Sequence, residues 1–309
     1  MTNKISIVTP TFNEEENISE LCEAISKEMQ NFEYDYEHII IDNNSTDKTI
    51  PIIKKIAETD KRVKIIINAR NFGHVRSPVY GILQSSGDAT ILLNSDFQEP
   101  PELITKYIKE WENGHKIVLG QRSSSDTNKS MNFFRSIFYK IINKISEVPL
   151  SERTSGTGLF SKEIVNQVRN MNDPYPYFRG MLSEINADVK LIPFHQNIRK
   201  RGNTKNNFFT LYDTGMLGIV KHSRMPLRFM IFIGFLSSLI SFGIAMFYFI
   251  YKLIYWDSFE IGIAPLVIGI FGFASIQILL LGIIGEYIGI LLIHLRNLPL
   301  VIEKERINF

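Results

Sequence analysis

Short apolar runs alternate with helix-like patterns through the first 122 residues of the chain. The apolar runs have the length of buried strands, and they are Ile5–Val8, His38–Ile41, Val63–Ile67, Thr90–Leu93 and Lys116–Leu119. Between the first two runs, apolar residues recur at helical spacing from Ile18 to Met29, and Asn13 is a candidate N-cap for that helix. Strands that alternate with helices predict an α/β fold, in which a mostly parallel sheet is covered on both faces.

Two long apolar stretches lie near the C-terminus. Residues 227–251 contain a single charged residue, Arg228, and residues 261–285 contain none. Each stretch exceeds the roughly 20 residues that a helix needs to cross a bilayer. We therefore expect two transmembrane helices within residues 227–293, which makes the chain a multi-pass protein of the cell inner (plasma) membrane.

Basic residues flank this pair of apolar stretches on the outside. Arg224 and Arg228 lie at its N-terminal side and Arg296, Lys304 and Arg306 follow it, whereas the connection between the two stretches has one lysine and two acids. Because Lys and Arg are enriched in cytoplasmic segments, both termini are expected in the cytoplasm. The N-terminus runs directly into the first predicted strand, so no signal peptide is expected.

These patterns divide the chain into four parts. We expect residues 1–205 to form a cytoplasmic domain, and residues 206–226 to form an amphipathic helix that lies in the membrane interface. The transmembrane helices follow, and residues 294–309 are a cytoplasmic tail. For residues 206–226, the alternative is a helix packed on the soluble domain.

Composition excludes several classes of protein. The net charge of +2 gives no case for nucleic-acid binding, and the single cysteine, Cys22, excludes an intramolecular disulfide framework. Neither Gly-x-Gly-x-x-Gly nor Gly-Lys-Ser/Thr follows a predicted strand, which disfavours a dinucleotide-binding domain and a phosphate-binding loop.

Polar residues follow each of the first four predicted strands. They are Thr9–Glu14, Asp42–Asp47, Asn68–Gly73 and Asn94–Gln98. Parallel strands end at the same edge of a sheet, where α/β proteins bind ligands, so these segments predict a ligand site. Asp96 and Gln98 offer oxygen ligands that suit Mg²⁺ or Mn²⁺ bound together with substrate phosphates. For any one of these segments alone, a polar turn is the ordinary alternative.

Six motifs in order resemble those of glycosyltransferase family 2, in particular its polyprenyl-phosphate glycosyltransferases and dolichyl-phosphate mannose synthases. The motifs are Thr9–Glu14, Asp42–Asp47, Arg70–Gly73, Asn94–Glu102, Arg199–Lys205 and Gly285–Gly289. The resemblance extends over essentially the whole chain. It implies the GT-A fold, a Rossmann-like and mostly parallel α/β domain, here with a C-terminal anchor of two transmembrane helices.

The resemblance also implies roles for individual residues. Those expected to bind the donor nucleotide are Pro10, Thr11, Asn13, Glu14, Asp42, Asn71, Asn94 and Ser95. Asp96 and Gln98 are expected to bind the metal ion. Those expected to bind the acceptor or its phosphate are Arg122, Thr157, Arg199, Arg201, Thr204 and Lys205. Asp96, Arg199 and Lys205 are the expected catalytic residues.

Three positions depart from the family pattern. Asn94 and Asn43 each replace an acid, and Thr157 stands where relatives carry an aspartate that has been proposed as a base or acceptor-site group. At position 94 the amide oxygen can still bind a ribose hydroxyl or a metal, although one negative charge is lost. The change at position 43 is expected to affect contacts with the nucleotide.

The resulting expectation is an inverting transferase that moves one sugar from a nucleotide sugar to a polyprenyl (undecaprenyl or dolichyl) phosphate in cell-envelope glycan synthesis. A UDP-sugar is favoured over a GDP-sugar, and the resemblance suggests a homotetramer. Two alternatives stay open, a catalytically inactive nucleotide-sugar-binding membrane subunit and a transferase with a carbohydrate acceptor. A processive polysaccharide synthase is disfavoured, because the sequence lacks Gln-x-x-Arg-Trp.

Overall fold

The structure is a computed structural model. It describes residues 3–122, 154–185, 188–196, 216–217, 220–221, 225–255, 263–296 and 298–309. Most of the expected interfacial helix at residues 206–226 lies outside the described residues.

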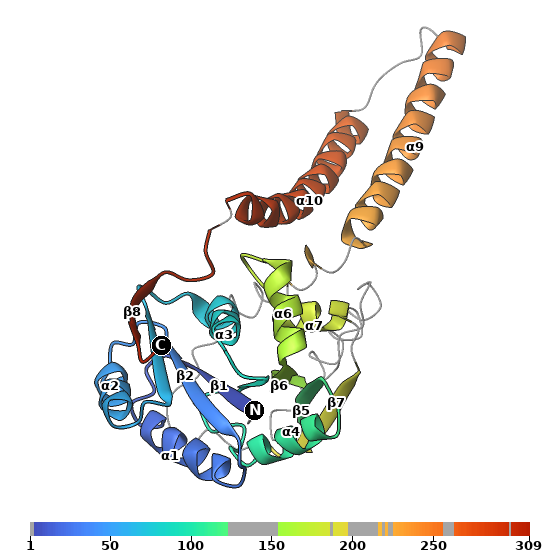
Figure 1. Cartoon of the computed structure of the whole chain (residues 1–309). Coiled ribbons are helices and arrows are strands. Elements are labelled where there is room, and N and C mark those ends of the chain that lie inside the picture. The colour runs from blue at the N-terminus through green and yellow to red at the C-terminus, as the bar shows by residue number, and fades with distance from the viewer. Residues whose placement is uncertain are drawn as a thin grey trace.

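One sheet organises the N-terminal domain, and its described strands number eight (Figure 1). They are β1 (Lys4–Thr11), β2 (Asp35–Asp42), β3 (Val63–Asn68), β4 (Ala89–Leu92), β5 (Ile117–Arg122), β6 (Thr154–Ser161), β7 (Val189–Phe194) and β8 (Glu303–Ile307). Their order across the sheet is β7-β5-β6-β4-β1-β2-β3-β8. Strands β6 and β8 run antiparallel to their neighbours, and the other described pairings are parallel. The expected α/β fold of GT-A type is therefore confirmed.

Helices cover both faces of the sheet (Figure 1). They are α1 (Ile18–Met29), α2 (Thr49–Thr59), α3 (Gly73–Leu83), α4 (Leu103–Glu112), α6 (Lys162–Met171) and α7 (Phe178–Ile185). Helices α1, α2 and α4 pack on one face, and α3, α6 and α7 pack on the other. Alternate residues of each central strand therefore enter two different cores. The expected apolar face of the first helix is confirmed, since Cys22 is buried there and burial raises the pKa of its thiol to about 12.

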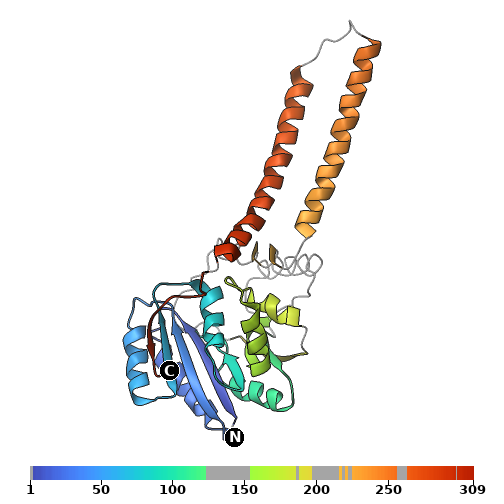
Figure 2. The same cartoon turned by 45° about the horizontal axis from the view of Figure 1, so that its top comes forward.

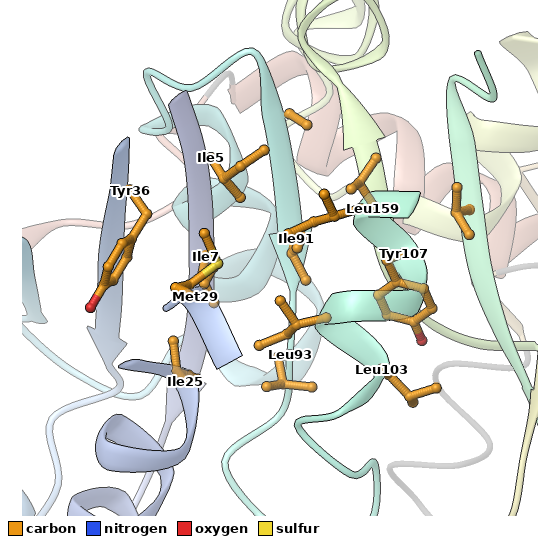
Figure 3. Close-up of a cluster of buried hydrophobic side chains, with 14 of the residues drawn as sticks. Ile5, Ile7, Ile25, Met29, Tyr36, Ile91, Leu93, Leu103, Tyr107 and Leu159 are labelled. Carbon is orange, nitrogen blue, oxygen red and sulfur yellow. The ribbon is translucent and has the colours of Figure 1, made fainter. Parts of the chain in front are cut away.

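One hydrophobic core lies beneath α1 and α4. Ile5 and Ile7 of β1 and Ile91 of β4 pack there with Tyr107 of α4 and Leu159 of β6 (Figure 3). Each fully buried side chain of this size contributes about 1.5–3 kcal/mol relative to an exposed one.

A glycine lets the antiparallel strand β6 enter the sheet between β4 and β5. A Cβ atom at Gly158 would lie 2.1 Å from the carbonyl oxygen of Val118, so no side chain fits at this position. The close approach allows β6 to pair with both neighbours, and it places Thr157 at the same edge as the C-terminal end of β4.

The expected cap of the first helix is wrong. Helix α1 begins at Ile18 with Asn17 at the N-cap position, and no side chain caps it. Asn13 instead adopts a left-handed conformation with φ of 55°, which asparagine tolerates better than most residues. Its side chain accepts a hydrogen bond from the amide of Thr46 (2.7 Å), so it belongs to a loop–loop contact.

Two long helices extend from the domain, α9 (Met225–Ile254) and α10 (Ile263–Arg296) (Figure 2). Both are longer than the expected stretches at 227–251 and 261–285. Among the described residues, the segment Ile276–Arg296 is long and apolar enough to cross a membrane, and Pro226–Ser237 is apolar but shorter. The described residues thus supply one such stretch, and the two-helix anchor is not confirmed.

The segment expected to be a tail contains strand β8, which pairs with the edge strand β3. The amide of Ala69 donates to the carbonyl of Ile302 (2.8 Å), and the side chain of Asn308 donates to the carbonyls of Ala57 and Val63. Lys54 and Glu305 form an ion pair across the same edge. The chain therefore leaves the domain before α9 and returns to it after α10 (Figures 1 and 2).

Candidate active site

The four polar segments predicted at strand ends do lie along one edge of the sheet. Strand β1 is parallel to β2 and β4, and β2 is parallel to β3, so their C-terminal ends are neighbours. Thr11 pairs directly with Asp42 in the β1–β2 register. The loops after these strands therefore form one continuous polar rim.

The loops after β1 and β2 are joined by hydrogen bonds between backbone and side chains. The amide of Asn13 donates to the hydroxyl of Ser45 (2.8 Å), and the amide of Glu14 donates to the hydroxyl of Thr49 (2.8 Å). Pro10, Asn13 and Glu14 are half-buried, so they retain surface toward the rim. This arrangement fixes the backbone that the resemblance assigns to nucleotide binding.

Asp42 lies below the surface of the rim. Its residue is fully buried, and its carboxylate accepts hydrogen bonds from both the amide (2.8 Å) and the hydroxyl of Ser45. Burial raises the pKa of Asp42, and the hydrogen bonds from Ser45 oppose that rise only in part. Thr11 is buried as well. In this structure Asp42 therefore shapes the loop after β2, and its expected contact with the nucleotide stays a prediction.

Asn43, one of the three departures, connects two loops. Its amide oxygen accepts hydrogen bonds from the side chain of Asn68 (2.9 Å) and from the amide of Phe72 (3.3 Å). The neighbouring turn is closed by Asn71, whose side chain accepts a hydrogen bond from the amide of Gly73 (2.7 Å). Because a carboxylate would use an oxygen in the same way, the amide at position 43 preserves this connection.

The loop after β4 holds the candidate metal ligands. Asn94, Asp96 and Gln98 are half-buried, whereas Ser95 and Glu99 are buried. The hydroxyl of Ser95 donates to the carbonyl of Pro10 (3.2 Å), which ties the loop to β1. Asp96 accepts a hydrogen bond from the amide of Gln98 (3.2 Å).

The donor set of this loop fits a hard divalent cation that also takes ligands from its substrate. The half-buried residues of the loop offer the carboxylate of Asp96 and the amide oxygens of Asn94 and Gln98, and the described residues contain no group of three or more His, Cys, Asp or Glu that could hold a metal ion alone. Mg²⁺ is commonly held by one or two carboxylates together with substrate phosphates. Asp96 and Gln98 match that pattern, and a diphosphate would complete the coordination.

Thr157 and Arg122 lie beyond β4, on β6 and β5. Thr157 is buried, and its hydroxyl donates a hydrogen bond to the buried carboxylate of Glu99. Arg122 is half-buried at the end of β5. Sequence reasoning missed Glu99, because its contact with Thr157 joins residues 58 positions apart and leaves no local pattern.

The expected acceptor residues Arg199, Arg201, Thr204 and Lys205 lie outside the described residues. Their roles in catalysis and lipid-phosphate binding stay predictions.

Comparison with known proteins shows which family this chain resembles. The family model described as glycosyl transferase family 2 matches residues 6–189. The chain is 33% identical to CsbB of Bacillus subtilis (strain 168), whose name assigns it provisionally to the glycosyltransferases, over 97% of this chain and 91% of that protein. It is 31% identical to the SfII prophage-derived bactoprenol glucosyl transferase of Shigella flexneri, over 98% of each chain.

A looser likeness exists to a crystal structure of glucosyl-3-phosphoglycerate synthase from Mycobacterium tuberculosis in complex with Mn²⁺, UDP and glucosyl-3-phosphoglycerate. The TM-score is 0.48 at 18% sequence identity, with 71% of this chain and 78% of that chain covered. The family model matches more than half of this chain, and two relatives exceed 30% identity over nearly its full length. The protein therefore belongs to glycosyltransferase family 2.

Proposed function

We propose that this protein transfers one sugar from a nucleotide sugar to a polyprenyl phosphate. The observation that carries the proposal is the similarity to a bactoprenol glucosyl transferase over 98% of both chains, since it includes the C-terminal helices as well as the catalytic domain. The rim of polar loops and the metal-ligand oxygens of the loop after β4 support a nucleoside-diphosphate sugar as the donor substrate. A UDP-sugar is preferred to a GDP-sugar.

The residues of the rim suggest how transfer proceeds. The nucleotide would lie across the ends of β1, β2 and β4, and Asp96 and Gln98 are the residues that would hold a Mg²⁺ or Mn²⁺ ion beside the diphosphate. When bound, such an ion neutralises the charge that develops on the leaving group. The phosphate oxygen of the lipid attacks the anomeric carbon on the side opposite the diphosphate. As the new bond forms, the bond between the anomeric carbon and the diphosphate breaks, the nucleoside diphosphate leaves, and the configuration is inverted.

A phosphate acceptor needs no protein base. A phosphate monoester has a second pKa near ~6, so it is mostly a dianion at pH 7. Its nucleophilic oxygen already carries negative charge, and the protein has only to position it. This agrees with the structure, in which the hydroxyl of the buried Thr157 donates a hydrogen bond to Glu99. The family resemblance implies an aspartate at position 157, and a phosphate acceptor does not need that carboxylate as a base.

The transfer reaction itself tests the proposal. Purified full-length protein with Mn²⁺ and a short-chain polyprenyl phosphate should convert a UDP-hexose into polyprenyl-phosphate hexose, as measured by mass spectrometry. GDP-mannose and UDP-N-acetylglucosamine serve as comparison donors. Nucleotide binding without transfer from any donor would support the inactive-subunit alternative, and transfer only to an oligosaccharide would support a carbohydrate acceptor.

We further propose that α9 and α10 anchor the protein in the membrane as a hairpin. Strand β8 follows α10 and is hydrogen-bonded to β3, so the domain and the C-terminus must lie on the same side of any membrane that the helices cross. Arg228 near the start of α9 and Arg296 at the end of α10 lie at the domain end of the hairpin. Positive charge there favours the cytoplasmic side. The suggested homotetramer stays a prediction.

Cysteine labelling in intact cells should reveal this topology. In a Cys22→Ser background, a cysteine replacing Ser258, between the two helices, should react with a membrane-impermeant maleimide added outside. A cysteine replacing the exposed Lys304 of β8 should react only after the cells are permeabilised. Labelling of both positions in intact cells, or of Lys304→Cys alone, would contradict the hairpin.

A further inference from the structure

The loop that carries the candidate metal ligands is attached to the sheet on both sides. Ser95 bonds to the carbonyl of Pro10 on β1, and Glu99 accepts a hydrogen bond from Thr157 on β6. These two anchoring residues are buried, whereas Asp96 and Gln98 between them are half-buried. The loop is thus attached to β1 and β6, the two neighbours of β4, and the candidate metal ligands lie between the two points of attachment.

The backbone between the anchors adopts a conformation that needs support. Phe97 has a φ of 54°, which is uncommon for a bulky residue with a Cβ atom. Residues held in such sparsely populated regions are destabilising and persist only where surrounding contacts maintain them. Packing of Phe97 against the core beneath α4 supplies one such contact, and the two anchors supply others.

The Glu99 anchor is set into the core beneath the rim. Leu159, two residues after Thr157 on β6, packs in the same cluster as Tyr107 of α4 (Figure 3). Burial raises the pKa of the Tyr107 hydroxyl, and the charge of the nearby Glu99 carboxylate raises it further. A buried carboxylate is stabilised by its hydrogen-bond donors, since a hydrogen bond to a charged group is stronger than one between neutral groups.

From this geometry we infer that Glu99 and Thr157 are positioning residues for the metal site. Their hydrogen bond holds the loop in the conformation that presents Asp96 and Gln98 to one divalent ion. The inference rests on the proposed function, because it presumes that this loop binds a metal ion with the nucleotide. It also gives a reason for a threonine at position 157, where its hydroxyl serves as a donor to Glu99 rather than as a base.

The test measures metal binding directly. Free Mn²⁺ is followed by electron paramagnetic resonance while it is titrated into the full-length protein in the presence of UDP. Thr157→Val replaces the hydroxyl with a methyl group of similar size. It should raise the Kd for Mn²⁺ about 10–100-fold, as is typical when a residue that orients a metal ligand is changed. Thr157→Ser keeps the donor and should bind Mn²⁺ like the unmodified protein.

A matched control is available on β4. Thr90 is fully buried and donates to the hydroxyl of Ser85 (2.7 Å), away from the rim. Thr90→Val removes a buried hydroxyl in the same way and should leave Mn²⁺ affinity unchanged. UDP binding without metal confirms that each variant is folded, and Thr157→Ala carries the same prediction if Thr157→Val does not fold.

Kinetics separate positioning from chemistry. In the transfer assay, Thr157→Val should require more Mn²⁺ for half-maximal rate, and saturating Mn²⁺ should restore most of that rate. Unchanged Mn²⁺ affinity in Thr157→Val, or a lost rate that saturating Mn²⁺ does not restore, would overturn the inference while leaving the proposed function intact. If the unmodified protein bound no Mn²⁺ with UDP, the metal-dependent function would fail first, and the inference with it.

Discussion

Replacing Asp96 with asparagine should reduce sugar transfer by at least about 10²–10³-fold, the loss typical when one key electrostatic group of an active site is removed. The substitution keeps the size of the side chain and an oxygen that can accept the hydrogen bond from the amide of Gln98. It removes the one negative charge that the half-buried residues of this loop offer to a cation. Initial rates with Mn²⁺ or Mg²⁺, with and without EDTA, measure the effect.

Glu102 provides the control for this substitution. It is an exposed carboxylate in the same segment, six residues further on. Glu102→Gln changes the net charge by the same amount and should leave the transfer rate unchanged. Full activity of Asp96→Asn, equal losses in both variants, or indifference of the unmodified enzyme to EDTA would each contradict the assignment of Asp96.

Deleting residues 302–309 should destabilise the catalytic domain, although the deleted segment lies outside the rim. The deletion removes the pairing of β8 with β3 and the hydrogen bonds of Asn308. At about 1 kcal/mol for each lost hydrogen bond, the total is several kcal/mol. A domain of this size then melts at least about 5 °C lower. Thermal unfolding of the detergent-solubilised protein measures the change.

The exposed edge of β3 should also make the truncated protein self-associate, since unpaired edge strands template further pairing. Size-exclusion chromatography would detect the aggregates. As a control, Glu305→Gln breaks only the half-exposed ion pair with Lys54 and should cost at most about 1 kcal/mol. A truncated protein that melts like the intact one and stays dispersed would show that β8 adds nothing to the fold.

The parallel part of the fold could be predicted because its signals are local. Each buried strand is a short apolar run, and each is followed at once by the polar residues of its loop, so these strands and their shared edge were predictable. The predicted ends at Ile41 and Ile67 fall one residue short of the observed ends, and the predicted end at Val8 falls three residues short, because β1 continues through polar residues to Thr11. The same reasoning predicted the loop of Asp96 and Gln98.

The other strands give much weaker signals. Strand β8 reads Glu-Lys-Glu-Arg-Ile, a charged run typical of an exposed tail, and its partner β3 is more than 230 positions away. Strand β6 contains two glycines, and its place between β4 and β5 depends on a close backbone approach that no local pattern reveals.

Side-chain partners across loops were harder still. Asparagine is a residue type that often caps helices, but the contacts of Asn13 with Ser45 and Thr46 depend on where the next loop lies. The pairing of Glu99 with Thr157 likewise became visible only in three dimensions. The sequence thus predicted the four polar segments that form the rim, and the structure was needed to show which of their residues are buried and hold the loops in place.

The position of β8 in the sequence also determines when the sheet can be completed during synthesis. Domains generally begin to fold from the N-terminus while the chain is still being synthesised. The last strand of this domain follows both long helices in the sequence, so β3 has no β8 to pair with until α9, α10 and β8 itself have been synthesised. During that interval the nascent domain has an unpaired β3 edge, and its sheet is completed only after both long helices have been synthesised.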